Sequence, residues 1–336
     1  MNLISSDKFY DEHWIAYAKL LNEINRKHYQ EEAEKEIQWE SFKRKVLNET
    51  EILKADHAKQ FLVIDHGKAA GWYAQRLIGG EVNFCFDVPD DMVTDEFIKT
   101  IFDNLYEFLH FAGKENAHTD TSEKRISNSL IRHGAEETDK MIFSRICRNE
   151  IDILNLNSIM ESVSSKLNLR LEFFDNVSDE IFDRYYEVYN EARVSMNEFN
   201  PHRKEVVKRS KENLRTKLRF DTGPEDKMFM YMLFDGDEIA AFSSLYVRKE
   251  RPKVIDHGGG LTAVSGKYRG NNFAKFLKAK LYVKILNEYP DFEYIMTDTY
   301  PWNKYMYRIN ESMGFKPFKE FTEFRISKDK LNKKMK

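Results

Sequence analysis

The sequence predicts an α/β protein built from two domains in tandem. Its 336 residues suit two domains, or one large one. A hydrophobic content of 41%, with 25 Phe and 17 Tyr, suffices for sizeable cores. The third observation is the order of expected elements, because helices, a hairpin and then alternating strands and helices occur twice. Residue identity between the halves is faint, so the alternative is two α/β domains that share some order without a duplication.

The first half begins with two helices in residues 8–53, where Trp14, Tyr17 and Ala18 mark one apolar face and Phe42 and Val46 mark another. Alternating apolar residues and turn signals then predict further elements. In order, these are a hairpin over Gln60–Leu77, a strand Glu81–Val88, a helix Asp95–Phe111, a strand Ala117–Thr121, a helix Lys124–His133 and a strand Met141–Ile146. The apolar side of the helix Asp95–Phe111 is expected to consist of Phe97, Ile98, Ile101, Phe102, Leu105, Phe108 and Leu109.

The second half repeats this order after an expected linker over residues 151–168, which places the domains at residues 1–150 and 169–336. The predicted elements are a strand Leu169–Phe174, helices Ser178–Val194 and Lys204–Leu218, hairpin strands Met228–Phe234 and Ile239–Val247, a long strand from Val254, a helix from about Asn272, a strand Tyr294–Thr299, and a final helix and strand.

Charge and cysteine content limit the partners and the compartment. The 53 basic and 56 acidic residues leave a net charge of −3, so no global field favours nucleic acid. Cys85 and Cys147 lack the spacing of a metal or redox pair, and we expect buried thiols in a reducing cytosol. Neither a signal peptide nor a membrane-spanning apolar run is found in the sequence. We expect a cytoplasmic protein without metal, membrane or nucleic acid, and a homodimer is compatible with the sequence.

The stretch Val254–Leu286 predicts a phosphate site. It begins as an extended run, passes through the turn SGKYRGNN and becomes a helix in which Phe273, Leu277, Leu281 and Ile285 recur every four positions. The first backbone N–H groups of a helix have no internal partner and lie at its positive end. A diphosphate can therefore accept hydrogen bonds from them.

This stretch also resembles the acetyl-CoA loop of the GNAT (GCN5-related N-acetyltransferase) superfamily, whose pattern is Arg/Gln-x-x-Gly-x-Gly/Ala. Arg269 and Ala274 match, and Gly270 fills a position where Gly is frequent. Asn272 stands where the family prefers Gly, but Asn tolerates left-handed backbone and caps helices well.

A second motif follows downstream. The segment PWNKYMYRINESMGFKPF and the strand before it are similar to the GNAT pattern T-x-N-x-x-x-N-x-x-M-x-x-x-N-E-x-x-G-F of branches related to mycothiol synthase. Thr299 stands where the first Asn is usual; the matching residues are Thr297, Asn303, Met306, Asn310, Glu311, Gly314 and Phe315. The resemblance implies two GNAT-like domains, each with a mixed, mostly antiparallel central sheet flanked by helices.

The resemblance also implies how acetyl-CoA is held. A splayed strand would pair with the pantetheine arm, and Gly258–Gly260 suit a place where a ligand comes close, with an empty bulge as the alternative. Lys267, Lys275 and Lys278 are expected to be solvated charges more often than phosphate contacts. The implied cofactor-binding residues are Thr262, Ala263, Val264, Arg269, Gly270, Asn271, Asn272, Phe273, Ala274 and Asn303.

Catalytic and acceptor residues follow less directly. Many GNAT enzymes have a Tyr general acid where this chain has Asn310, so Tyr307, one helical turn earlier, is the candidate acid, with packing as its alternative. Asp256 is the candidate base, with His257 beside it; the alternatives are a satisfied strand-end residue and deprotonation through a water chain. The acceptor is expected at the loop SMNEFNPHRK, where Asn197 and Glu198 supply polar contacts or merely cap and cover the surface.

The first half differs at the corresponding turn. Its sequence PDDMVTDE carries four carboxylates and a proline where an anion needs bare N–H groups. We therefore expect residues 1–150 to form a degenerate GNAT-like domain without acyl-CoA. The leading hypothesis is an acetyl-CoA-dependent N-acetyltransferase for a small amine or peptide amine. The alternatives are a non-catalytic acyl-CoA-binding or scaffold protein and an aminoacyl-tRNA-dependent transferase, against which the near-neutral charge counts.

Overall fold

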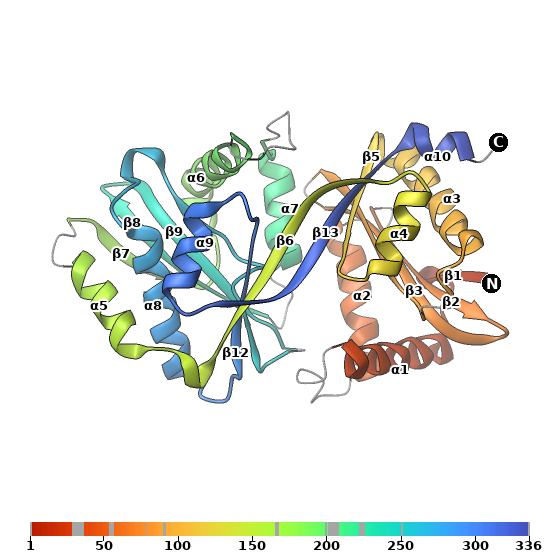
Figure 1. Ribbon diagram of the computed structural model, residues 1–336, viewed down its shortest axis with the longest axis horizontal. Coiled ribbons are helices and arrows are strands. Elements are labelled where there is room, and N and C mark those ends of the chain that lie inside the picture. The colour runs from red at the N-terminus through yellow and green to blue at the C-terminus, as the bar shows by residue number, and fades with distance from the viewer. Residues whose placement is uncertain are drawn as a thin grey trace. The chain divides into compact units, whose positions relative to one another are not determined.

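The structure is a computed structural model that describes residues 2–28, 37–53, 57–78, 80–89, 92–164, 168–198, 200, 208–221, 226–249 and 251–334. Contacts divide the chain into two compact units. The first contains Met1–Lys140, Glu212–Phe220 and Phe321–Lys336, and the second contains Met141–Lys211 and Asp221–Glu320. Each unit has a mixed, mostly antiparallel sheet flanked by helices, as predicted (Figure 1).

The sheet of the first unit has the strand order β1-β2-β3-β4-β5-β13. Neighbours are antiparallel except β4 and β5, which are parallel. The strands are β1 (Asn2–Ser5), β2 (Ala58–Asp65), β3 (Lys68–Ile78), β4 (Glu81–Asp87), β5 (Asn116–Thr121) and the later part of β13 (Lys316–Ser327). Strand β1 and helix α10 were not predicted from the sequence.

The helices of the first unit are α1 (Asp11–His28), α2 (Trp39–Leu53), α3 (Asp95–Ala112), α4 (Lys124–Arg132), α10 (Lys328–Lys334) and most of α7 (Lys211–Asp221). Helix α3 buries the apolar side that its periodicity predicts, because seven of its apolar residues lie in the core of the unit. These are Phe97, Ile98, Ile101, Phe102, Leu105, Phe108 and Leu109.

The sheet of the second unit has the order β6-β12-β10-β9-β8-β7, with β11 paired to β9. In the pairings of the described residues of this unit, β10 and β12 are parallel and the other neighbours are antiparallel. The strands are the later part of β6 (Glu136–Cys147), β7 (Arg170–Phe174), β8 (Lys227–Asp235), β9 (Glu238–Val247), β10 (Val254–Asp256), β11 (Thr262–Val264) and β12 (Tyr294–Thr299). The helices are α5 (Ile153–Ser164), α6 (Asp179–Glu198), α8 (Phe273–Glu288) and α9 (Lys304–Ser312).

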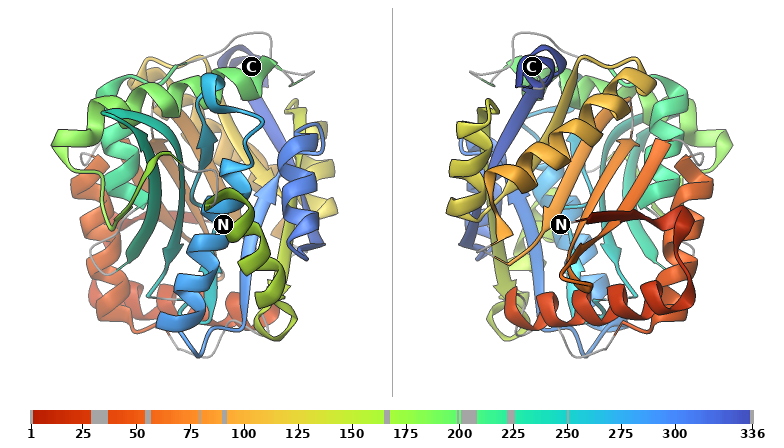
Figure 2. Two further views of the ribbon diagram at one scale, coloured as in Figure 1. Left: turned by 90° about the vertical axis from the view of Figure 1, so that its left-hand side faces the viewer. Right: turned by 90° about the vertical axis from the view of Figure 1, so that its right-hand side faces the viewer.

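Residues 151–168 do not form the expected linker. Ile153–Ser164 fold as α5, which lies beside α8 (Figure 2, left). Leu156, Ile159 and Val163 recur at helical spacing and are buried in the core of the second unit, so burial of this apolar stripe stabilises the helix. The predicted helix Lys204–Leu218 also differs, since α7 begins at Lys211 and residues 201–207 lie outside the described part.

Strand pairing explains why the units are discontinuous in sequence. Residues 322–327 of β13 pair with β5, which places the C-terminal segment in the first unit. Residues 142–147 of β6 pair with β12 in the second unit. The expected boundaries at 1–150 and 169–336 therefore differ from the units at both segments. Cys85 and Cys147 are free thiols, and both are half-buried rather than buried.

The helix ends that precede these two strands have the same geometry. Gly134 after α4 and Gly314 after α9 have φ angles of 97° and 91°. The next residue in each case donates from its N–H to a carbonyl five residues earlier, Ala135 to Leu130 at 3.0 Å and Phe315 to Asn310 at 3.1 Å. This glycine-dependent helix end recurs at equivalent places and favours the predicted duplication.

Candidate acyl-CoA site in the second unit

Strands β10 and β12 separate after a short parallel pairing. Val254–Asp256 pair with Tyr294–Met296, and the N–H of His257 donates to the carbonyl of Met296 at 2.8 Å. The chain then bends through three glycines and continues as β11, which pairs with β9 instead. In the strand pairings of the described residues, β11 has no bond to β12, so the two strands splay apart and their facing edges stay open. Open backbone edges inside a protein need a partner.

The glycines make this bend possible. A Cβ on Gly260 would lie 1.9 Å from the carbonyl oxygen of Ser244, and one on Gly259 would lie 2.7 Å from Oδ2 of Asp256. Side chains at these positions would therefore push the bend away from β9.

Asp256, the candidate base, holds the bend in place. Its Oδ1 accepts a hydrogen bond from the N–H of Gly259 at 2.7 Å, and its Oδ2 lies 3.4 Å from Nε of Arg248. The Arg248 guanidinium also lies over the ring of Tyr246. Both carboxylate oxygens are thus engaged, which is the arrangement expected of a satisfied strand-end residue.

The loop after β11 has the backbone shape that its glycine pattern predicts. It begins with a short 3₁₀ turn, Gly266–Tyr268, whose first N–H donates to Oε1 of Glu191 at 2.5 Å. Gly270 and Asn272 both have positive φ angles, 83° and 60°. Asn272 therefore adopts the left-handed conformation for which the family uses Gly.

The first turn of α8 leaves its amides open. The side chain of Asn272 makes no capping bond, and the N–H groups of Phe273, Ala274 and Lys275 have no hydrogen-bond acceptor within the described ranges. No acidic residue lies in that turn. These groups form a positive, donor-rich end suited to a phosphate.

Arg269 is tied to its own surroundings. Its Nε donates to the carbonyl of Val264 at 3.3 Å, and a terminal nitrogen donates to Oγ of Ser195 at 2.7 Å. The guanidinium thereby links the loop to α6. Its predicted phosphate contact remains a prediction, as do the ligand contacts of the other loop residues.

Helix α9 lines up the residues of the second motif. Asn303 is its N-cap and accepts from the N–H of Met306 at 3.3 Å. Tyr307, one turn later, is half-buried, and its hydroxyl has no partner among the described residues. Asn310, later in α9, is buried against the end of β12, and its Nδ2 donates to Oγ1 of Thr299 at 2.9 Å. Its Oδ1 is buried and has no hydrogen-bond partner among the described residues.

A buried polar cluster on the α8 side of the sheet was not predicted. His257 is its centre: Nδ1 lies 2.9 Å from the hydroxyl of Tyr282, and Nε2 lies 3.2 Å from the hydroxyls of both Ser243 and Thr262. Burial, and next the charge of Lys278, hold the pKa of His257 well below its usual value. The imidazole is therefore neutral at pH 7 and bridges β9, β11 and α8.

The expectation that Lys278 is a solvated charge is wrong. Its side chain is only 1% exposed, and burial lowers its pKa to about 7 although nearby Asp298 opposes the shift. The helical pattern contained the signal, because Lys278 lies one turn from both Ala274 and Tyr282 on the side of α8 that faces the sheet.

The acceptor residues are placed only in part. Asn197 and Glu198 lie in the last turn of α6, but their side chains and His202 lie outside the described residues. Asn200 is buried. Glu191 and Ser195 of the same helix accept hydrogen bonds from Gly266 and Arg269 in the loop between β11 and α8, so α6 borders the candidate site.

The corresponding turn of the first unit is occupied by its own side chain. Oγ1 of Thr94 accepts from the N–H of Phe97 at 3.2 Å, and Asp95 and Glu96 occupy the first turn of α3. This arrangement removes one donor and adds negative charge. The prediction that this unit does not bind acyl-CoA agrees with that geometry but is not tested by it.

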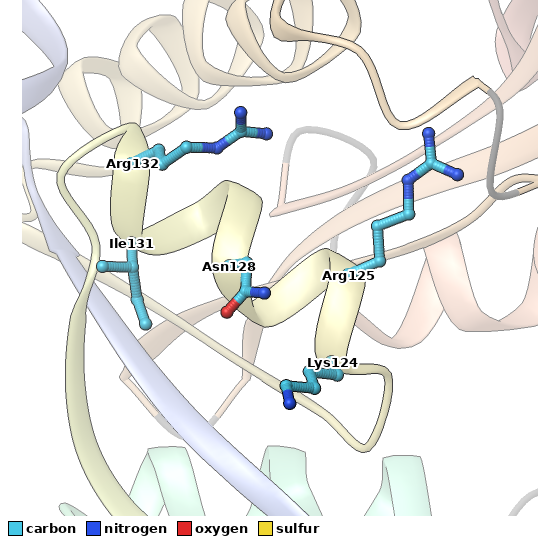
Figure 3. A pocket seen from close by; sticks show the side chains of 5 residues that line it. All are labelled: Lys124, Arg125, Asn128, Ile131 and Arg132. Atoms are coloured by element: carbon cyan, nitrogen blue, oxygen red, sulfur yellow. The ribbon is translucent and has the colours of Figure 1, made fainter.

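A hollow of about 730 Å³ in the first unit contains no predicted site residue (Figure 3). Its residues belong to α4 and are Lys124, Arg125, Asn128, Ile131 and Arg132. In the described part of the chain, no three His, Cys, Asp or Glu side chains are placed to hold a metal ion. Among the same residues, no helix combines the length and apolar character needed to cross a bilayer.

Comparisons with known proteins show the fold. No family model and no curated protein matches the chain. It is similar to a solved tandem GNAT protein from the clavulanic acid biosynthesis pathway, without AcCoA, at 12% identity and a TM-score of 0.72, with 97% of this chain and 99% of the other covered. A GCN5-related N-acetyltransferase from Sphaerobacter thermophilus is similar at 12% identity and a TM-score of 0.59, covering 97% and 96%.

The chain therefore has the fold of tandem GNAT proteins, as the two sequence motifs indicated. Neither description names mycothiol synthase, so the predicted branch stays a prediction.

Proposed function

We propose that the second unit binds acetyl-CoA and transfers the acetyl group to an amine nitrogen. The observation that carries this proposal is the combination of the β11–β12 splay with open N–H groups at the start of α8. The diphosphate would accept hydrogen bonds from Phe273–Lys275, and the amides of the pantetheine arm would pair with the free edges of β11 and of residues 297–299.

The fold neighbours, which are described as GNAT proteins, support an amine as the acceptor. We propose a small amine or peptide amine, bound near the end of α6 by Asn197 and Glu198. The amine attacks the thioester carbonyl, and the leaving thiolate needs a proton. Tyr307 is the residue that the sequence predicted as the acid, and its hydroxyl has no partner among the described residues, whereas Asp256 would have to leave Arg248 and Gly259 to act as a base.

Substitution of Ala274 tests the binding site. The negative charge of an Asp at this first-turn position repels a diphosphate, so Ala274→Asp should raise the Kd for acetyl-CoA by at least about tenfold. The matched control is Ala274→Asn, which has the same shape without the charge and should bind much more tightly than the Asp variant. Titration calorimetry measures both, and equal affinity of the two variants would refute this placement of the diphosphate.

Transfer is tested by CoA release with a panel of small amines and peptides. A non-catalytic acyl-CoA-binding protein is the second candidate, favoured by the neutral Asn310 where the family has its Tyr acid. Binding of acetyl-CoA without transfer or hydrolysis would support that candidate. The absence of any binding would refute both.

A further inference from the structure

The splay has a defined vertex, the bond between the His257 N–H and the Met296 carbonyl. Just beyond it, a Cβ on Gly258 would lie 3.2 Å from Cγ of Asp298, so the Asp298 carboxylate lies against the bend. Lys278 interacts electrostatically with both His257 and Asp298, and its amine lies 5.9 Å from the ring centre of Phe315. The Lys278 amine therefore lies near the vertex, on the α8 side of the sheet.

Three polar groups from different elements make no hydrogen bond to the described chain in this region. Lys278 is 1% exposed and its amine has no hydrogen bond or close ion pair there, and Thr297 is 3% exposed and its hydroxyl has no hydrogen bond there. Oδ1 of Asn310 is also buried and unsatisfied. Buried polar groups are normally paired, and a buried cation is especially costly without a partner. Because all three groups belong to the same region, we infer a binding site in which a ligand supplies the missing hydrogen bonds.

The proposed binding mode brings the thioester to this place. CoA has its diphosphate at one end of the pantetheine arm and its sulfur at the other. With the diphosphate at the first turn of α8 and the arm between the open strand edges, the sulfur is the part that reaches furthest toward the vertex. Lys278 follows Phe273, the first residue of α8, by five residues, which corresponds to about 7.5 Å along the helix axis. The buried amine therefore borders the sulfur end of the site.

We propose that Lys278 is a catalytic residue of this acetyl transfer, which donates its proton to the sulfur as the thioester breaks. This inference rests on the proposed function. The acceptor nitrogen forms a bond to the carbonyl carbon, and the C–S bond breaks with its electron pair moving to sulfur. The Lys278 ammonium protonates that sulfur, the acceptor nitrogen loses a proton to water, and Lys278 regains one from water. The products are an amide and the free thiol of CoA.

The environment of Lys278 suits this step. Negative charge appears on sulfur only as the bond breaks, so a desolvated ammonium stabilises the transition state more than the bound thioester. With a pKa of about 7, Lys278 is a stronger acid than an ordinary thiol, whose pKa is about 8.5. Protonated and neutral forms are both populated at neutral pH. Asn310 has no acidic proton to donate.

Binding of CoA and desulfo-CoA tests the contact between Lys278 and sulfur. A hydrogen bond to a charged group is worth enough for the wild type to bind CoA about tenfold more tightly than desulfo-CoA. In Lys278→Met, which keeps the unbranched side chain up to the position of Cε but lacks the amine, this ratio should fall toward one. Lys280→Met, on the same helix, is the control and should keep the wild-type ratio. Calorimetry that shows equal ratios in wild type and Lys278→Met overturns the inference alone, whereas no CoA binding to the wild type refutes the proposed function.

Kinetics test the proton transfer itself, with slow hydrolysis of acetyl-CoA as the minimal reaction. Loss of a general acid should lower kcat about 100-fold in Lys278→Met while KM for acetyl-CoA changes little. Lys278→Arg should not restore kcat, because arginine retains its proton. Wild-type kcat should also fall above about pH 7 as Lys278 deprotonates, and the Met variant should lack this limb. A normal kcat in Lys278→Met together with a large loss in Tyr307→Phe would assign the proton to Tyr307 instead.

Discussion

The position of Lys278 in α8 buries its side chain, whereas the charged amine of a lysine is more stable in water. The helix places the residue on its sheet-facing side between Ala274 and Tyr282, and the amine is consequently buried near Asp298 and His257. Burial of an ionisable side chain disfavours its charged form, so such a residue costs stability. A buried ionisable residue whose pKa is strongly shifted is a candidate for function.

The pH dependence of stability measures this cost. The folded pKa of Lys278 is about 7, below its unfolded value of about 10.4, so the unfolded chain binds more protons between these limits. The free energy of unfolding contributed by Lys278 therefore rises from pH 7 to 10 and is lost as the pH falls to 7, by roughly 5 kcal/mol at most. Lys278→Met should exceed the wild type in stability near pH 6–7, and the difference should shrink toward pH 10.

Urea unfolding of both proteins across this range provides the measurement. Subtracting the two curves removes groups that titrate alike in both, such as exposed carboxylates. Lys280→Met removes a lysine from a more exposed position of the same helix and serves as the control. A difference between wild type and Lys278→Met that stays constant from pH 6 to 10 would contradict the shifted pKa.

At the scale of elements, local patterns and distant pairings differ in how well the sequence predicts them. The apolar spacing of α3 predicted all seven of its buried residues, and β12 has the bounds that its sequence predicted. The pairing of β13 with β5 was not predicted. Alternation in a strand specifies which side is buried but carries no information about which strand lies beside it. The splay, in contrast, was expected from the resemblance to the GNAT loop, and the glycines at 258–260 agreed with it because their effect on the backbone is local.

Substitution of Gly260 should disrupt the splay. A Cβ there meets backbone, 1.9 Å from the Ser244 carbonyl oxygen, so the bend must move away from β9. Gly260→Ala should lower the free energy of unfolding by about 1–3 kcal/mol, the range for overpacking, and weaken acetyl-CoA binding. Gly258→Ala is the matched control, because its Cβ would lie at 3.2–3.3 Å from Asp298 and needs a shift of only tenths of an ångström. Thermal melting and calorimetry that rank the two variants alike would contradict this account of the bend.

At the scale of the whole molecule, each unit depends on chain segments from both halves of the sequence. The C-terminal segment Phe321–Lys336 belongs to the first unit, where it contributes Phe324, Ile326 and Leu331 to the buried core. The open site in contrast consists of residues from the second unit alone, on β11, β12, α8 and α9. Stability of one unit and ligand binding by the other therefore respond to different parts of the chain.

A truncated chain that ends at Glu320 tests whether the stability of the first unit and ligand binding by the second unit are independent. It removes one of the two strands that pair with β5 and three buried apolar side chains from the first unit, where a single Phe→Ala change already costs about 3–5 kcal/mol. Hydrogen exchange should therefore show lost protection in β5 and α3, while β9 and α8 keep theirs and acetyl-CoA still binds. Phe324→Ala should reproduce part of this loss, whereas Phe318→Ala, on the same strand but 40% exposed, should cost far less. If β9 and α8 lost protection together with β5, the two units would unfold as one, and the division by contacts would have no energetic counterpart.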